Sequence, residues 1–139
     1  MLRNNFKNKK VVFAGCARDC EKYLEKTLSN INYYTSLFEE SYQIIVENGS
    51  KDRTREILKS KKNPNCYYLF EDHLDEYKAR GERLERARNI IIEKIKSEPN
   101  LRNCDLLIIL DLDDIGEYRI ENKNILKSLE FLFSKKNIA

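Results

Sequence analysis

The sequence predicts an α/β fold built on a mainly parallel sheet with flanking helices, a Rossmann-like arrangement. Four short apolar runs alternate along the chain with segments whose apolar residues recur at helical spacing. None of the four runs alternates apolar with polar residues, which is typical of strands covered on both faces. The resulting order β-α-β-α-β-α-β-α indicates right-handed crossovers between parallel strands.

The four predicted strands all lead into acidic segments. The strands are VVFAG (11–15), YQIIVE (42–47), CYYLF (66–70) and DLLIIL (105–110). The segments at their ends are Ala17-Arg18-Asp19, Glu47-Asn48-Gly49-Ser50, Glu71-Asp72 and Asp111-Leu112-Asp113-Asp114. Ligands of open parallel sheets bind beyond the carboxyl ends of the strands. Acid at all four ends therefore favours a cation-dependent site at that edge.

Four helices are predicted between and after these strands. We expect Asp19 to be the N-cap of the first helix, and Ser50 and Asp52 to cap the second. The third helix begins at about Arg80 and ends before Pro99. Apolar residues at helical spacing mark the first, third and last helices; they are Leu24, Leu28, Ile31 and Leu37, then Leu84, Ala87, Ile91, Ile92 and Ile95, then Ile125, Leu129, Leu132 and Phe133.

Length and composition limit the classes of function. The 139 residues predict one domain spanning 1–139, and a net charge of +3, from 26 basic and 23 acidic residues, argues against a nucleic-acid partner. The sequence shows neither a leader nor a membrane span, so we expect a cytoplasmic protein. In that compartment the four cysteines stay reduced, and their spacing does not favour zinc.

The segment IILDLDDIG (108–116) is the clearest sign of a metal site. In an extended chain Asp111 and Asp113 point the same way and Asp114 points to the other face. Two carboxylates on one face repel each other unless a cation lies between them. Oxygen ligands suit Mg²⁺ or Mn²⁺, which are then shared with substrate phosphates. The alternative interpretation is a polar turn that caps the next helix.

Two further segments carry residues suited to a phosphorylated ligand. In VENGSKDRT (46–54) Gly49 permits a tight turn directly after Glu47. In RGERLERARN (80–89) the residues Arg80, Arg83 or Arg88 could face a diphosphate. For the remaining arginine of that segment, Arg86, we expect a solvated face with ion-pair partners.

Taken together, VVFAGCARD, IIVENGSKDRT and LIILDLDD resemble the glycosyltransferases of GT-A fold, over about residues 11–116. ENGSKDRT and RLERARN are similar to segments of the fungal capsule-associated α-1,3-mannosyltransferase family. The resemblance implies transfer of a sugar from a UDP- or GDP-linked donor, with Mn²⁺ or Mg²⁺, to an acceptor that is a glycan, a protein or a lipid.

The resemblance also implies roles for individual residues. Asp113 would bind the metal, and Asp111 would contact the metal or the ribose. Glu47 would contact the base or ribose. The nucleotide-sugar-binding residues are expected to be Ala17, Arg18, Asp19, Glu47, Asn48, Arg88 and Asp111.

Only 25 residues follow Asp114, whereas such enzymes extend well beyond this segment. We therefore expect the nucleotide-binding half of the fold, lacking the acceptor-binding part. An alternative is a catalytically incomplete nucleotide-sugar-binding remnant or subunit. A haloacid dehalogenase-like phosphatase, which also carries a DxD segment after a strand, is a less favoured alternative.

Overall fold

The computed structural model describes residues 4–134 and confirms the predicted α/β fold. Its centre is a four-stranded parallel sheet of order β3-β2-β1-β4. The strands are β1 (Lys10–Ala17), β2 (Glu40–Glu47), β3 (Cys66–Phe70) and β4 (Leu106–Ile109). Each lies within one or a few residues of its predicted range.

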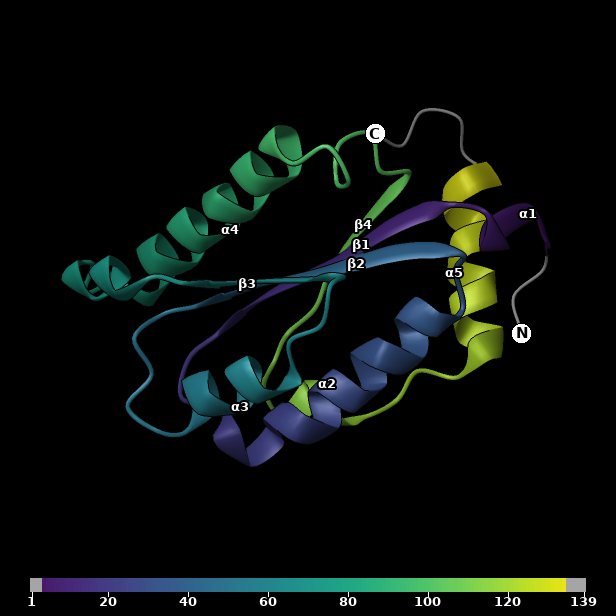
Figure 1. The fold of residues 1–139 in the computed structure, drawn as a ribbon. Coiled ribbons are helices and arrows are strands. Elements are labelled where there is room, and N and C mark those ends of the chain that lie inside the picture. Colours follow the sequence, from purple (N-terminus) through teal and green to yellow (C-terminus); the bar gives the residue numbers. More distant parts are fainter. Residues whose placement is uncertain (1–3, 135–139) are drawn as a thin grey trace.

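Helices cover both faces of the sheet (Figure 1). α4 lies on one face, and α2 and α3 lie on the other. α1 and α5 lie together at the end of the sheet where the strands begin. The helices are α1 (Asn4–Lys7), α2 (Glu21–Ser36), α3 (Thr54–Lys61), α4 (Arg80–Ser97) and α5 (Asn122–Ser134), with short 3₁₀ turns η1 (Asp72–Glu76) and η2 (Asp114–Glu117).

The core forms two layers, one on each face of the sheet. Successive residues of β1 alternate between them, as the two-residue period of a strand requires. Val11 and Phe13 pack with α2, and Val12 and Ala14 pack on the opposite side with Ile91 of α4. This two-sided burial is the physical reason why the strands read as continuous apolar runs.

The register aligns the carboxyl ends of β1 and β2. Ala17 pairs with Glu47 at the last position of the two strands, whereas β4 ends where Ile109 pairs with Ala14. The chain after β4 therefore passes close to the last residues of β1. A side chain at Gly15 would bring a Cβ to 2.7 Å from the carbonyl oxygen of Leu110, so glycine is required there.

Two of the predicted helix caps are wrong. The N-cap of α2 is Cys20, and Asp19 has a φ of 48°, outside the helix. The Ser50 hydroxyl accepts a hydrogen bond from the Asp19 amide (3.1 Å) instead of capping α3. The N-cap of α3 is Arg53, and the carboxylate of Asp52, one residue before it, accepts from the Thr54 amide (2.9 Å), the first amide of the helix. Because β1 and β2 are neighbours, the loops that follow them lie side by side, and side chains of each loop accept hydrogen bonds from backbone amides of the other.

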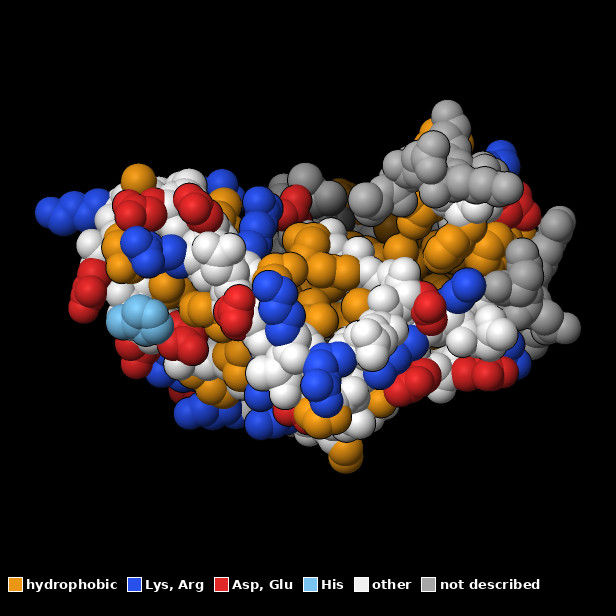
Figure 2. Space-filling view, turned by 90° about the horizontal axis from the view of Figure 1, so that it is seen from above, with side chains coloured by type: hydrophobic (Ala, Val, Ile, Leu, Met, Phe, Trp, Pro, Cys, Tyr) orange, Lys and Arg blue, Asp and Glu red, His pale blue; other side chains and the backbone are white. Residues whose placement is uncertain are grey.

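The surface is strongly ionic. Figure 2 shows acidic and basic side chains intermixed on one face, beside a central hydrophobic area. In the described part of the chain, no helix combines the length and hydropathy needed to span a bilayer. The cysteines are all free thiols, with Cys20 and Cys66 buried and Cys16 and Cys104 partly so.

Candidate functional site

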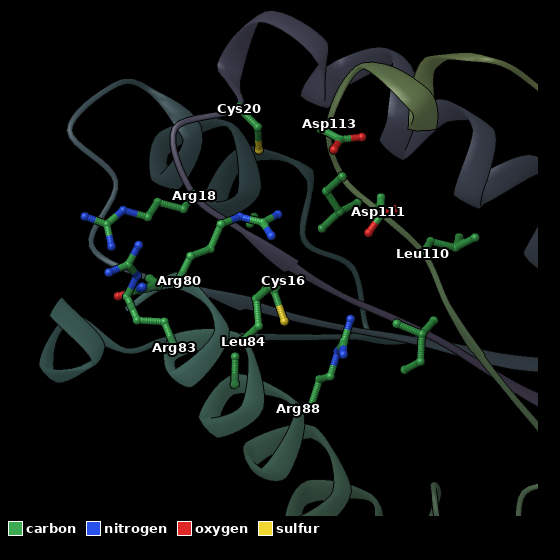
Figure 3. A pocket seen from close by; sticks show the side chains of 15 residues that line it. Cys16, Arg18, Cys20, Arg80, Arg83, Leu84, Arg88, Leu110, Asp111 and Asp113 are labelled. Carbon is green, nitrogen blue, oxygen red and sulfur yellow. The ribbon is translucent and has the colours of Figure 1, made fainter. Parts of the chain in front are cut away.

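A cavity of about 400 Å³ opens at the edge of the sheet where β1 and β4 end (Figure 3). Three parts of the chain form it: the end of β1, the first half of α4 and the segment after β4. Asn48, directly after β2, adds to its wall. This is the place where parallel sheets bind ligands.

One wall of the cavity is acidic. Asp111 and Asp113 both line it and are exposed, while Leu112 between them is buried in the core. The alternation of a polar, an apolar and a polar residue therefore directs the two carboxylates to the same side, as predicted. The side chain of Asp114 lies outside the described residues.

Asn30 of α2 holds the segment that follows the acidic wall. Its buried side chain donates hydrogen bonds to the carbonyl oxygens of Gly116 and Glu117, both at 2.9 Å. Its own oxygen accepts from Nε of Arg119 (3.0 Å). A side chain at Gly116 would bring a Cβ to 2.6 Å from the carbonyl oxygen of Asp111. This contact network sets where the acidic wall lies.

The opposite wall is basic. Arg80, Arg83 and Arg88 of α4, any of which the sequence allowed to face a diphosphate, all line the cavity. Arg86 points elsewhere: it stacks on the Tyr77 ring and pairs with Glu82. In Figure 3, Arg80 reaches into the cavity, and Arg88 lies near Asp111.

Arg83 and Arg18 are held in defined orientations at the end of the cavity farther from the aspartates (Figure 3). Nη1 of Arg83 donates to the carbonyl oxygens of Tyr77 (2.8 Å) and Lys78 (2.7 Å). The side-chain amide of Asn48 fits its surroundings when its oxygen faces Arg18. In that orientation the oxygen accepts from Nη1 of Arg18 (3.2 Å), and the nitrogen donates to the carbonyl oxygen of Glu71 (3.3 Å).

Comparison with known proteins agrees with this architecture. The model of glycosyl transferase family 2 matches residues 16–118. The chain belongs to glycosyl transferase family 2. The match includes β1 from Cys16 onward, the whole cavity and the acidic segment. A search of curated proteins gives no match.

The family 2 assignment confirms the expected class of protein, a glycosyltransferase domain of the kind that uses a nucleotide-sugar donor. It also confirms the GT-A character inferred from the three sequence segments. In this family 2 domain, Ala17, Arg18, Asn48, Arg88, Asp111 and Asp113 are the predicted site residues that line the cavity.

Glu47 does not lie where the sequence interpretation placed it. It is at the expected edge of the sheet, but its carboxylate is fully buried and is absent from the cavity wall. One oxygen accepts from the Ser50 amide (2.6 Å), and the other pairs with Arg55 (2.6 Å). Arg55 also binds Asp72, whose pKa it lowers. Glu47 thus supports the loop after β2 from beneath.

Asp19 is also outside the cavity wall. Its carboxylate accepts hydrogen bonds from the amides of Lys51 (2.7 Å) and Asp52 (3.4 Å). In return the fully buried Thr54 accepts from the Cys20 amide (2.9 Å). These reciprocal bonds join the loops after β1 and β2 into one unit, here called the braced loops (17–20 and 47–54).

Asp52 links the two helices that follow the braced loops. One carboxylate oxygen accepts from the first amide of α3, and the other accepts from the first amide of α2, Glu21 (3.1 Å). Burial would raise the pKa of Asp52, but the hydrogen bonds from Thr54 and from the Glu21 amide outweigh it and lower the pKa. Negative charge at two helix N-termini is favourable.

The thiol of Cys16 lines the cavity between the two charged walls. Burial raises its pKa; Arg88 lowers it in part, and Asp111 raises it further. The thiol is therefore protonated at neutral pH, which does not favour a role for Cys16 as a thiolate nucleophile.

The described residues contain no group of three or more His, Cys, Asp or Glu side chains arranged to hold a metal ion. Asp111 and Asp113 nevertheless fit a shared metal. Mg²⁺ is usually held by one or two carboxylates, waters and substrate phosphates rather than by a complete protein cage. Two exposed carboxylates facing arginines that can bind phosphate provide that partial set.

Proposed function

We propose that this chain binds a nucleoside-diphosphate sugar in the cavity and transfers the sugar to an acceptor, with a divalent cation at Asp111 and Asp113. The proposal rests mainly on one observation. A family 2 domain brings two carboxylates and three arginines of one helix into a single cavity at the ligand-binding edge of its sheet.

Charge complementarity supports this assignment. The diphosphate of the donor would meet the two aspartates with like charge, so a cation between them is needed for binding. Held by Asp111 and Asp113, Mg²⁺ or Mn²⁺ would supply positive charge to balance the negative charge of the departing nucleoside diphosphate. Arg88, which lines the same cavity as Asp111, would bind the same diphosphate through its guanidinium.

The remaining contacts follow from the shape of the cavity. With the diphosphate near the aspartates, the nucleoside extends along Ala17 and Arg18 toward Asn48. The braced loops hold this side of the cavity, and we assign Asp19 and Glu47 a supporting role in them. The proposal thus gives this chain the donor-binding part of the reaction.

A finer relationship is also part of the proposal. ENGSKDRT and RLERARN support a place near the fungal capsule-associated α-1,3-mannosyltransferase family within the broader group. In the structure the first of these segments belongs to the braced loops, and the second provides the arginines of the basic wall.

Calorimetric titration of UDP and GDP with Mn²⁺ tests the proposal. At least one of the two nucleotides should bind with Mn²⁺, and this binding should disappear in EDTA. If neither binds in Mn²⁺, or if EDTA has no effect, the assignment of the cavity is wrong.

Turnover separates the enzyme from its main alternative. Release of nucleoside diphosphate from UDP- or GDP-linked sugars, followed with and without Mn²⁺, should be detectable for an active transferase. Metal-dependent binding with no turnover of any tested donor would instead identify a nucleotide-sugar-binding subunit.

A further inference from the structure

The strand β4 forms an apolar edge of the sheet. In the described part of the chain it pairs with β1 alone, and β3 forms the other edge. A cation borders β3, since Nζ of Lys94 lies 5.4 Å from the centre of the Tyr67 ring, and charge at an edge discourages further pairing. Residues 106–110, LLIIL, contain neither charge nor proline. An edge of this composition is a template for another strand.

Both faces of β4 are incompletely covered. On the α4 side, Ile109 is 44 % exposed and Ile92 of α4 is 40 % exposed. Figure 2, which views this side, shows a hydrophobic area in the centre of the face. On the α2 side, Ile108 and Leu110 border a cavity of about 60 Å³ whose other walls are aromatic or aliphatic. A strand paired with β4 would therefore bury apolar side chains on both faces.

The backbone of β4 has two residues whose hydrogen-bonding groups face the open edge. The Leu110 amide donates to the carbonyl oxygen of Ala14 in β1 (2.8 Å). Because successive residues of a strand direct their N–H and C=O groups to opposite sides, Leu107 and Ile109 direct theirs away from β1. These two residues are the positions at which a further strand would bond.

A second copy of β4 is a strand that fits these positions. With a two-fold axis at Ile108, Leu107 of one copy lies opposite Ile109 of the other, and each such pair exchanges two hydrogen bonds. Leu106 and Leu110 are opposite each other as well, so all of these pairs are aliphatic. A register shifted by two residues would instead place an aspartate, 105 or 111, opposite an aliphatic residue.

Charges at the two ends of β4 also fit this arrangement. Arg102 is exposed before the strand, and Asp111 is exposed after it. Antiparallel pairing brings the beginning of one strand to the end of the other, so Arg102 of each copy approaches Asp111 of the partner subunit. Asp105, at the beginning of the strand, turns its carboxylate toward β1, where it accepts from the Lys10 amide (2.8 Å).

We propose that two copies of this chain associate through β4, in antiparallel register centred on Ile108, and join their four-stranded sheets into one. The partner strand would lie beside Ile109 and Asp111, which line the cavity, and would therefore border the site of each copy. The association needs no ligand, so it can be tested independently of the proposed function.

Sedimentation velocity without nucleotide or metal tests the association. Over a concentration series into the high micromolar range, the mass should rise from 16.6 kDa toward twice that value. Ile109→Lys would bury an unpaired ammonium group in each half of the interface, so the dissociation constant should rise at least about 100-fold. Phe131→Lys, at an exposed aromatic position of α5, is the matched control and should leave it unchanged. Urea denaturation checks that both variants are folded.

Cross-linking tests the register. Ile108 would lie opposite itself, in a pair without hydrogen bonds whose Cα atoms are about 4.5 Å apart, a separation that a disulfide can span. Ile108→Cys should therefore form a covalent dimer with oxidised glutathione. Wild type controls for the native thiols, which are all free, and Leu107→Cys controls for a new thiol that lies opposite Ile109. Both controls should cross-link much less.

Each result supports or overturns the inference. If wild type stays monomeric over the whole series, β4 receives a strand from another polypeptide or none, and the inference is wrong. If wild type is dimeric but a folded Ile109→Lys associates equally well, or Ile108→Cys cross-links no more than Leu107→Cys, a different surface forms the dimer and the inference is again wrong. Nucleotide binding is measured separately, so none of these results decides the proposed function.

Discussion

Two regions that border the cavity, the braced loops and the acidic segment after β4, are built in different ways. The braced loops after β1 and β2 are joined by hydrogen bonds within the chain, among them the buried bond from the Cys20 amide to Thr54, and the fully buried Glu47 accepts from the Ser50 amide inside the second loop. The acidic segment after β4 instead exposes Asp111 and Asp113 and is held from behind by Asn30. The braced loops are fixed by contacts within the chain, whereas the acidic segment presents two carboxylates to the cavity.

This difference separates stability from binding. A change in the braced loops removes hydrogen bonds that the folded chain makes by itself, so the free energy of unfolding should fall. A change at the exposed carboxylates of Asp111 and Asp113 alters the cavity wall that the proposed ligand would contact. Variants of the two regions should therefore affect different measurements.

The largest expected effect is on binding. Asp113→Asn removes one anionic ligand, and Mn²⁺-dependent affinity for the nucleotide should fall at least about 100-fold, because even residues that only support metal ligands contribute about 10- to 100-fold. The free energy of unfolding, measured by urea denaturation, should stay within about 0.5 kcal/mol of wild type, as for most surface changes. Glu121→Gln, an exposed acid outside the cavity, is the control and should change neither.

Thr54→Val tests the braced loops. Valine keeps the shape of the side chain but leaves the Cys20 amide without its acceptor in a buried environment. The free energy of unfolding should fall by about 1–3 kcal/mol, measured by urea denaturation. Ser60→Ala removes a hydroxyl from an exposed position of α3 and should cost much less. An equal cost in the two variants would contradict the bracing role.

Gly116→Ala should affect both stability and nucleotide binding. The new methyl group would displace the Asp111 carbonyl, so both stability and Mn²⁺-dependent nucleotide affinity should decrease, stability by about 1 kcal/mol. Gly81→Ala is the matched control, since open space surrounds that position in α4. There alanine should stabilise the helix by up to about 1 kcal/mol and leave binding unchanged. Unchanged binding in Gly116→Ala would show that the acidic wall does not depend on this contact.

The smallest effect is a pH dependence from Asp52. Its pKa is lower in the folded chain than the value of about 3.9 typical of an unfolded chain, so the ionised form stabilises the fold. This contribution is fully present above about pH 5 and is lost as the pH falls through the folded pKa. The difference in urea midpoint between wild type and Asp52→Asn should therefore be larger at pH 6 than at pH 3. A difference of the same size at both pH values would contradict the role of the charge.

Much of the fold could be predicted because it depends on local patterns. The strands are buried on both faces, so each appears in the sequence as a continuous apolar run between polar ends. Arg86 was expected to have ion-pair partners, and in the structure it pairs with Glu82 and is absent from the cavity wall. The spacing of Asp111 and Asp113 likewise determined that they share one side of the chain.

The partners of the polar side chains depend on the tertiary structure. Asp19 and Asp52 look alike in the sequence as helix caps, but only the side-by-side placement of β1 and β2 decides that Asp19 bonds to Lys51, 32 residues away. The same placement buries Glu47 beside Arg55, and the position of η2 against α2 gives Asn30 its role. Apolar burial follows a periodic pattern along the chain, whereas a hydrogen bond needs one specific partner within about 3 Å. The sequence alone therefore determined the layers of this protein and the edge of the sheet at which the cavity lies, and the tertiary structure decided which polar groups line the cavity and which support the loops.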